Sequence, residues 1–185
     1  MFQTGQTGLV VRIPEAESAV RAWRERFDPS ARAGVPAHVT VLFPFLDERR
    51  IDARVCSVLA DVLGRHGAFG LRFARCGRFP GVLYLVPEPD GQLRRLTEAV
   101  AGRWPEAQPY GGKFTEVVPH LTVADSQDDG VPDELDEIEA ELLGKLPFTS
   151  WVSSVDLMVH DGARWQGRAS FALGETREMG ETGER

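Results

Sequence analysis

The stretch Ala37-His38-Val39-Thr40-Val41-Leu42-Phe43 predicts a β-strand, because it is a short apolar run rich in β-branched residues. The only side chains in it suited to acid–base chemistry or anion binding are those of His38 and Thr40. Side chains two residues apart on a strand point to the same face, roughly 7 Å apart. His38 and Thr40 therefore share one face, and Val39, Val41 and Phe43 share the other. The apolar face is expected to pack on a core, which turns the His/Thr face toward water or a cleft.

A second stretch, Pro119-His120-Leu121-Thr122-Val123-Ala124, repeats this pattern roughly half the chain length further on. The residues around the two stretches also repeat in order, as strand, helix, His/Thr strand, helix and strand. The first set is predicted over residues 9–13, 14–27, 37–43, 51–63 and 69–79, and the second over residues 82–86, 93–104, 119–124, 135–143 and 151–159. A last strand over residues 165–173 follows the turn Asp161-Gly162.

This repeat predicts an α+β, bilobal protein with two pseudo-symmetric halves. Each half is expected to contain an antiparallel-rich sheet flanked by helices, and both His/Thr strands are expected to line a central cleft. The prediction is a single domain over residues 1–173, with lobes of about 8–80 and 82–173. Residues 174–185 are rich in charge and lack apolar periodicity, which predicts a disordered tail.

The composition limits the classes of function. The 185 residues are 42% hydrophobic and 26% charged, as in ordinary globular proteins. The apolar runs are short and the N-terminus does not resemble a signal peptide, so we expect a cytoplasmic protein without a membrane partner. The formal net charge of -7 disfavours broad binding to duplex nucleic acid, although it allows a small phosphorylated ligand. Cys56 and Cys76 lack CxxC spacing and are expected to be buried and unpaired. We expect a monomer.

Two imidazoles facing one cleft suit general acid–base catalysis, since the ordinary histidine pKa lies near working pH. A threonine hydroxyl beside each histidine can hydrogen-bond an anionic oxygen. This set predicts reaction at a phosphodiester or cyclic phosphate without a metal or other cofactor. Lys113, in the Gly-rich loop before the second strand, is the preferred candidate for a neutralising cation, ahead of Arg12 and Arg32.

One His-x-Thr strand alone is a weak signal, whereas two copies at matching places favour a shared function. The remaining histidines have simpler interpretations: His66 follows a helix, where the dipole favours it, and His160 adjoins a turn and is expected at the surface. Several aromatic residues lie near the motif ends or in loops, where packing is the simpler role and stacking on a nucleobase the alternative. They are Phe43, Phe45, Tyr110, Phe114 and Trp165.

The motifs His38-Val39-Thr40 and His120-Leu121-Thr122, with Leu42-Phe43-Pro44-Phe45 and Pro119 beside them, resemble the two-histidine (2H) phosphoesterase superfamily, in particular its 2′-5′ RNA ligase-like branch. The resemblance extends from about Leu9 to Leu173. It implies a bilobal fold and metal-free action on 2′,3′-cyclic phosphates or 2′-5′ phosphodiester bonds of nucleotides or short RNA. It also implies that His38 and His120 are the catalytic acid–base pair and that Thr40 and Thr122 hold the phosphate. Phe43 and Lys113 are the further candidates for substrate binding.

Two other classes of function compete with this interpretation. A metallohydrolase could use His38, His120 and Asp125, but ligand spacing such as HExxH is missing, and strand alternation places Asp125 on the face opposite to His120. A non-catalytic module that binds nucleotides or phospho-ligands could use the same cleft, but it would not need both histidines.

Overall fold

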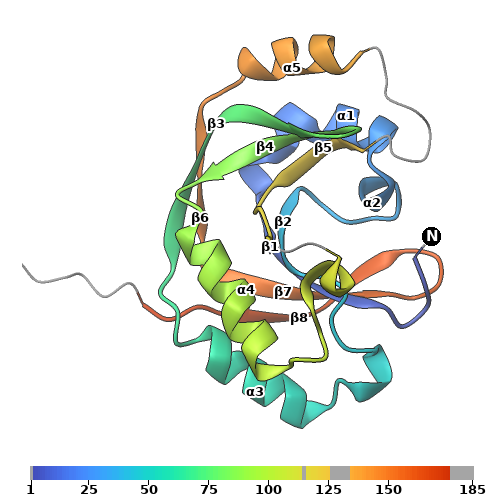
Figure 1. Cartoon of the computed structure of the whole chain (residues 1–185), viewed down its shortest axis with the longest axis vertical. Coiled ribbons are helices and arrows are strands. Elements are labelled where there is room, and N and C mark those ends of the chain that lie inside the picture. The colour runs from blue at the N-terminus through green and yellow to red at the C-terminus, as the bar shows by residue number, and fades with distance from the viewer. Residues whose placement is uncertain (1, 114–115, 126–133, 176–185) are drawn as a thin grey trace, which may run out of the picture.

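The computed structural model describes residues 2–113, 116–125 and 134–175 (Figure 1). Its strands are β1 (Thr7–Arg12), β2 (His38–Leu42), β3 (Phe69–Phe79), β4 (Val82–Glu88), β5 (Leu121–Asp125), β6 (Phe148–Val152), β7 (Ser154–His160) and β8 (Trp165–Ala172). Its α-helices are α1 (Glu17–Phe27), α2 (Pro29–Arg32), α3 (Ala53–Leu63), α4 (Gly91–Arg103) and α5 (Leu135–Leu143). Three 3₁₀ turns, η1 (Pro14–Ala16), η2 (Glu48–Arg50) and η3 (Pro109–Gly112), complete the described elements.

The strands form two four-stranded antiparallel sheets, with the orders β2-β1-β7-β8 and β5-β4-β3-β6. We call them the first and the second sheet. Figure 1 shows the two sheets as separate layers, with α1 and α5 outside the second sheet and α3 and α4 outside the first. The predicted α+β, bilobal fold with antiparallel sheets is thus confirmed.

The division into lobes differs from the predicted one of about 8–80 and 82–173. The first sheet takes β1 and β2 from the N-terminal part of the chain and β7 and β8 from the C-terminal part. The second sheet begins with β3, which forms a hairpin with β4 across the predicted boundary, so that Phe79 pairs with Val82. A two-residue connection favours antiparallel pairing of the strands that it joins. A boundary at residue 81 is therefore wrong for the sheets.

Helices α1 and α4 each follow a strand of one sheet in the sequence and pack against a strand of the other sheet. Helix α1 follows β1 of the first sheet but packs beside β5 of the second, and α4 follows β4 of the second sheet but packs beside β2 of the first. A buried hydrogen bond holds α4 against β2, because the Thr97 hydroxyl donates to the Val41 carbonyl oxygen over 2.7 Å. Each His/Thr strand is thus supported from behind by a helix that follows a strand of the other sheet.

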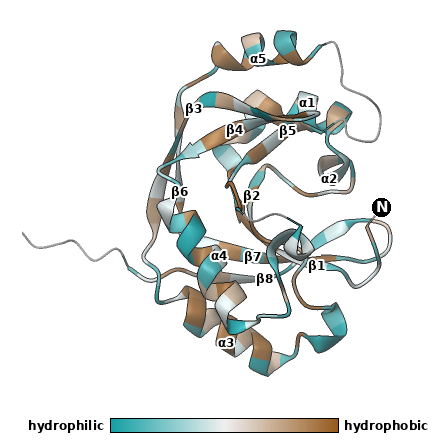
Figure 2. Ribbon diagram, in the orientation of Figure 1, coloured by the Kyte–Doolittle hydropathy of each residue, from teal (hydrophilic) through white to brown (hydrophobic). Residues whose placement is uncertain are grey.

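The apolar faces of the two motif strands lie in one continuous core. Val39 and Val41 of β2, and Leu121 and Val123 of β5, are at most 1% exposed. Alternation between apolar and polar residues predicts this burial. Figure 2 shows hydrophobic stretches along the strands and on the helices. Burial of these side chains holds the His/Thr faces in fixed positions.

Other local predictions are confirmed in part. The expected strand over residues 151–159 is two strands, because the chain leaves β6 of the second sheet at Ser153 and enters β7 of the first. Gly174, expected in a disordered tail, accepts a hydrogen bond from Ala68 and donates one to His66. Residues 176–185 of the predicted tail lie outside the described residues. Cys56 and Cys76 are unpaired, as expected, but they are only partly buried.

Candidate active site

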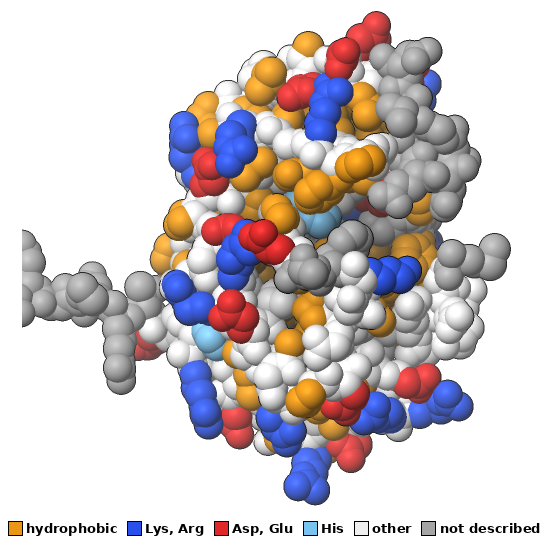
Figure 3. Space-filling view, viewed as in Figure 1, with side chains coloured by type: hydrophobic (Ala, Val, Ile, Leu, Met, Phe, Trp, Pro, Cys, Tyr) orange, Lys and Arg blue, Asp and Glu red, His pale blue; other side chains and the backbone are white. Residues whose placement is uncertain are grey.

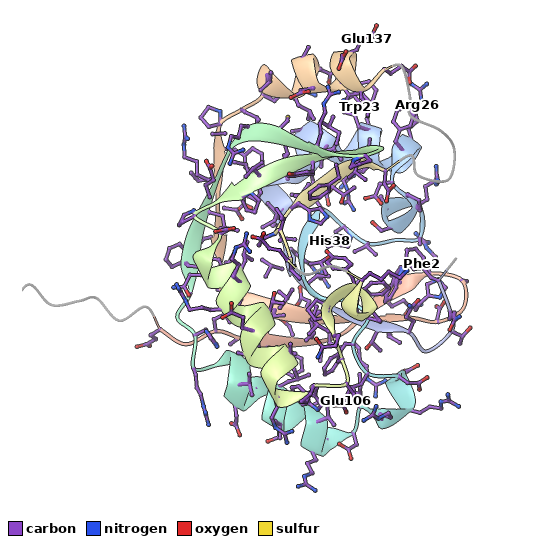
Figure 4. The ribbon with its side chains drawn as sticks, in the orientation of Figure 1. Phe2, Trp23, Arg26, His38, Glu106 and Glu137 are labelled. Atoms are coloured by element: carbon purple, nitrogen blue, oxygen red, sulfur yellow. The ribbon has the colours of Figure 1, made fainter. Side chains whose placement is uncertain are left out.

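The two His/Thr strands meet although they belong to different sheets. Strand β2 is an edge of the first sheet and β5 an edge of the second, and their Cα atoms approach within 8 Å of each other. His38 lies between the sheets near the centre of the molecule (Figure 4). Figure 3 shows a histidine side chain in the recess between the upper and lower parts of the surface. The structure therefore brings the two predicted motifs together.

Both histidines are anchored in the same way. The Nδ1 atom of His38 lies 2.8 Å from the carbonyl oxygen of Pro36, and Nδ1 of His120 lies 2.7 Å from that of Val118. A carbonyl oxygen can only accept a hydrogen bond, so Nδ1 carries a proton in each ring. In the neutral form, Nε2 of each imidazole is then unprotonated and able to take up a proton.

Burial favours the neutral form of both histidines. It is the main reason why the pKa of His38 is lowered to about 4, and the neighbouring Arg24 guanidinium is the next cause. Burial also lowers the pKa of His120, against the opposing effects of the Val118 carbonyl and of the carboxylates of Asp125 and Asp28. The two imidazoles also repel each other's charge. Protonation of one ring therefore disfavours protonation of the other.

Each motif strand has a β-bulge directly after its threonine. In β2, Thr40 pairs with Val10 and Leu42 with the adjacent Leu9; in β5, Thr122 pairs with Tyr84 and Ala124 with the adjacent Leu83. A bulge inserts one extra residue and so reverses the alternation that follows it. Phe43 and Asp125 lie beyond the bulges, so each of these side chains faces opposite to the direction that regular alternation predicts.

The bulges correct two predictions from strand alternation. Phe43 was expected on the apolar face, yet its ring packs against Val10 and Trp165 on the side of the first sheet that carries Thr40. Asp125 was expected opposite to His120, yet it pairs with Val82, which shares a face with Tyr84 and therefore with Thr122. Asp125 also acts electrostatically on His120. Phe43 thus lies near the motif as a candidate substrate contact, and Asp125 lies on the face of the second motif.

Aromatic side chains that the sequence prediction did not include surround His120. The rings of Phe79 and Tyr84 lie 5.2 Å and 5.4 Å from the imidazole, in edge-to-face contacts, and stack on each other at 4.4 Å. Tyr84 lies within the apolar strand β4 and is paired with Thr122. Its role depends on strand pairing, which no local pattern in the sequence reveals.

A second aromatic cluster adjoins the first motif. Phe43 and Phe2 contact each other and Trp165, and the ring of His160 lies 5.7 Å from Phe2 and 5.4 Å from Trp165. His160 is 5% exposed, so its predicted surface position is wrong. The pairing of His160 with Trp165 in the β7–β8 hairpin draws both side chains into this cluster.

The Gly-rich loop brings Tyr110 to the first motif. The Tyr110 backbone N–H donates to the Phe43 carbonyl oxygen over 2.6 Å, and its phenol hydrogen-bonds with the Thr40 side chain. Tyr110 adopts a left-handed conformation with φ of 51°, unusual for a residue with a side chain. Lys113 is exposed, and among the described residues its side chain forms no ion pair.

A buried ion pair lies beside both histidines. Arg24 of α1 donates two hydrogen bonds to one carboxylate oxygen of Asp28, over 3.0 Å and 2.8 Å. The other oxygen of Asp28 accepts from the backbone N–H and the hydroxyl of Ser30. Arg24 and Asp28 are 2% and 3% exposed, and both act electrostatically on His38. The sequence analysis singled out neither residue, because the side chain of an arginine does not reveal its partner.

The two weaker cation candidates differ in position. Arg12 pairs with His38 across β1 and β2 and forms an ion pair with Asp156 at 2.7 Å. Arg32 is exposed and donates to the carbonyl oxygen of Arg26. Within the described ranges, no three His, Cys, Asp or Glu side chains gather closely enough to hold a metal ion.

A model of the 2′-5′ RNA ligase superfamily matches residues 13–164 of the chain, including both motifs. The chain belongs to the 2′-5′ RNA ligase superfamily. It is also 29% identical over 131 residues to a protein of Bacillus cereus (strain G9842) that is named as a candidate phosphoesterase. That match spans 66% of this chain and 66% of the relative, just under two thirds of its length. The predicted relationship to two-histidine phosphoesterases is thus confirmed.

Solved structures share the fold of this chain. Escherichia coli LigT in complex with 3′-AMP superposes with a TM-score of 0.57 at 19% identity, covering 92% of this chain and 99% of LigT. The protein TT0787 of Thermus thermophilus gives a TM-score of 0.56 at 21% identity, covering 92% of this chain and 100% of TT0787. At these identities the likeness concerns the fold. In the described part of the chain, no helix is long and apolar enough to span a membrane.

Proposed function

We propose that this protein is a metal-independent phosphoesterase that acts on 2′,3′-cyclic phosphates or 2′-5′ phosphodiester bonds of nucleotides or short RNA, with ligation as the reverse reaction. One observation carries the proposal. His38 and His120, each held by Nδ1 on a backbone carbonyl, lie at the starts of neighbouring edge strands of two sheets, His38 as the first residue of β2 and His120 directly before β5. We further propose that the protein acts as a monomer in the cytoplasm, which gel filtration and cell fractionation test.

The arrangement fits a reaction that moves two protons. Hydrolysis of a phosphodiester requires a base that takes a proton from the attacking water and an acid that gives one to the leaving oxygen. Two Nδ1-anchored imidazoles supply two Nε2 atoms for these tasks. Both histidine pKa values are lowered by burial, so a neutral base is available at neutral pH, and a protonated ring supplies the acid.

Thr40 and Thr122 are the proposed phosphate contacts. Each lies on the same strand face as its histidine and is partly exposed, between buried neighbours. Hydroxyls fixed on two opposed strands can hydrogen-bond the phosphate oxygens as negative charge develops in the transition state. Rigid strands suit this task because the donors need no reorganisation during the reaction.

A nucleotide substrate is supported by the surroundings of the motifs. The aromatic ring of Phe43 lies beside the first motif and is partly exposed, so it offers a surface on which a base can stack. LigT has been solved with 3′-AMP, ATP and NADP+, all of them nucleotides. We assign substrate contacts to Phe43 and to Lys113 on the exposed loop.

The test is turnover of nucleoside 2′,3′-cyclic phosphates and short 2′-5′-linked oligonucleotides by the purified protein in the presence of EDTA. His38→Ala and His120→Ala are each expected to lower kcat by about 10²- to 10⁴-fold, as for loss of a general acid or base. His66→Ala, which removes a histidine from the turn after α3, is the matched control and should retain activity. Turnover that EDTA abolishes, or that both active-site variants retain, contradicts the proposal.

A binding experiment separates catalysis from the competing binding role. Isothermal titration of both alanine variants with 3′-AMP should show retained binding, because the threonines and aromatic rings remain. Binding of 3′-AMP by the wild type without turnover of any substrate above would instead favour a phospho-ligand binding module.

A further inference from the structure

One face of the first sheet carries both the first motif and a polar pair to which the proposed function gives no role. His38 and Thr40 of β2 pair with Arg12 and Val10 of β1, and Val10 pairs in turn with Asp156 of β7. Residues directly opposite each other on antiparallel strands point to the same face of the sheet. Arg12 and Asp156 therefore lie on the face on which the substrate is proposed to bind.

The side chain of Arg12 extends along this face, away from the motif. Its Nε atom forms an ion pair with Asp156 at 2.7 Å, and its Nη2 atom lies 3.9 Å from the sulfur of Met158 on β7. A Cβ atom added to Gly167 of β8 would lie 2.9 Å from Nη2, so the bare backbone of this glycine makes room for the guanidinium. Since β7 is the second strand from β2, the guanidinium lies on the order of 10 Å from the motif strand.

This anchoring leaves the outer edge of the guanidinium available. Asp156 and Met158 take the edge formed by Nε and Nη2, and no described residue accepts a hydrogen bond from Nη1. The Arg12 side chain is 45% exposed, whereas that of Asp156 is 12% exposed. The outer edge thus presents two parallel N–H donors, one from each Nη atom, in an orientation that the carboxylate fixes.

The surroundings of Arg12 suit a nucleobase better than a second phosphate. The carboxylate of Asp156 balances the charge of Arg12 and would repel an anion placed beside it. The same face is apolar next to the pair, where Val10, Met158 and Trp165 are between 3% and 6% exposed and pack together. A nucleoside spans a length comparable to the separation of the guanidinium from β2. A base can therefore reach Arg12 while its phosphate lies at the first motif.

An aromatic ring fills the corresponding place on the second sheet. Tyr84 pairs with Thr122 as Val10 pairs with Thr40, and the phenol ring lies over Gly77. Tyr84 is 8% exposed. Beside the second motif the sheet thus offers a buried ring, whereas beside the first motif it offers exposed donors.

We propose that Arg12, held by Asp156, recognises the nucleobase of the substrate and selects bases that carry two adjacent hydrogen-bond acceptors. This inference rests on the proposed function for the nucleotide and for the position of its phosphate. Guanine has such acceptors in O6 and N7, and cytosine has them in O2 and N3. In adenine, N7 and N1 each adjoin the amino group, which is a donor, and in uracil an N–H lies between the two carbonyl oxygens. Guanine and cytosine are therefore expected to be preferred over adenine and uracil.

The first test compares kcat/KM for the 2′,3′-cyclic phosphates of guanosine, cytidine, adenosine and uridine. The wild type should prefer the first two by about 5- to 100-fold, as for one bidentate arginine contact. Arg12→Lys keeps the positive charge beside Asp156 but loses the planar pair of donors, so the ratio should fall to near one. Arg21→Gln removes an exposed arginine from α1 and should keep the wild-type ratio.

Two results of this comparison overturn the inference. Equal kcat/KM for the four substrates in the wild type would mean that no base is selected. A full preference in Arg12→Lys would mean that the fork of donors is not what selects, and that Arg12 acts through its charge, as it would on a phosphate.

The second test alters Arg12 from the neighbouring strand. Gly167→Ala places a methyl group where Nη2 lies, so the guanidinium must move while both charges of the pair remain. The preference for guanine and cytosine should fall in this variant, whose fold circular dichroism checks. A folded Gly167→Ala protein with the wild-type preference contradicts the placement of the donors.

Binding measurements separate this inference from the proposed function. In isothermal titration, the wild type should bind 3′-GMP and 3′-CMP more tightly than 3′-AMP and 3′-UMP, and Arg12→Lys should lose this order. The same order without turnover of any cyclic phosphate refutes the proposed function and supports base recognition by Arg12. Turnover with equal binding of the four monophosphates and equal kcat/KM refutes base recognition and leaves the proposed function intact.

Discussion

The phenol ring of Tyr84 lies against the bare backbone of Gly77 on the neighbouring strand. A Cβ atom added to Gly77 would lie 2.5 Å from two ring carbons of Tyr84, closer than real Cβ contacts allow. The same ring touches His120. A residue without a side chain on β3 thus determines how closely an aromatic ring can approach the second histidine.

Gly77→Ala is expected to displace Tyr84 and to disturb His120. Overpacking of this kind costs about 1–3 kcal/mol of unfolding free energy, and turnover should fall because the ring that packs on His120 moves. Urea denaturation and kcat measure the two effects. Gly70→Ala is the control on the same strand, since its Cβ would meet Trp151 at an ordinary 3.7 Å. Equal effects of the two substitutions would contradict the steric explanation.

The stability of the protein should fall as the pH is lowered from about 6.5 to about 4, because of His38. Its pKa is about 4 in the folded chain, below the ordinary value of 6.5, so the unfolded chain binds the proton first. The stabilisation is complete above pH 6.5 and is lost as the pH falls through this range, by up to roughly 3 kcal/mol. Urea denaturation of the wild type and of His38→Gln at several pH values measures the difference, which should vanish if His38 titrates normally.

The pH optimum of kcat/KM should lie below 6.5. One histidine must be neutral and the other protonated, so the rate is greatest between their two pKa values. Burial lowers both pKa values from 6.5, and a diester substrate does not titrate in this range. Initial rates at low substrate concentration between pH 4 and pH 9 provide the measurement. An optimum above pH 7 would show that the rings are more accessible to water than in this structure.

Tyr110 is expected to act through Thr40. Its phenol hydrogen-bonds with that side chain, so Tyr110→Phe should lower kcat/KM in the wild-type background and have little further effect in Thr40→Val. The coupling energy for residues in such contact is about 0.5–3 kcal/mol. The kcat/KM values of the two single variants, the double variant and the wild type give this energy. Additive effects would mean that Tyr110 contributes independently of the threonine.

Thr97→Val should weaken the support of the first motif from behind. The hydroxyl donates to the carbonyl oxygen of Val41 within β2, at a site that is almost inaccessible to water. Loss of the donor leaves a buried acceptor unsatisfied, at a cost of about 1–3 kcal/mol. Thermal and urea denaturation test this, with Thr97→Ser as the control that keeps the hydroxyl. Equal stability of the serine and valine variants would argue against the hydrogen bond.

Much of the fold could be predicted from local pattern. Alternation of apolar and polar residues located the motif strands and their buried faces, and helical spacing located the helices α1, α3, α4 and α5. The two motifs also predicted the family. These signals are local, because each depends on residues within one strand or helix.

The failed predictions depend on partners distant in the sequence. The bulges after Thr40 and Thr122 exist only relative to the strands that pair with them, so Phe43 and Asp125 were assigned to the wrong faces. The break at Ser153 reflects a change of sheet, not a loss of β propensity. The burial of Arg24 and of His160 follows from the packing of whole elements, which charge and polarity alone would place at the surface.

The reciprocal placement of α1 and α4 has a consequence for how substrate enters. A hinge motion that parts the sheets would have to pull α1 off β5 and α4 off β2, exposing buried apolar surface at both crossings. The two sheets are therefore expected to stay together when substrate enters, without a hinge motion that parts them. The distance between the two imidazoles is set during folding, before any substrate is present, and a ligand must be slender enough to enter between parts that do not open.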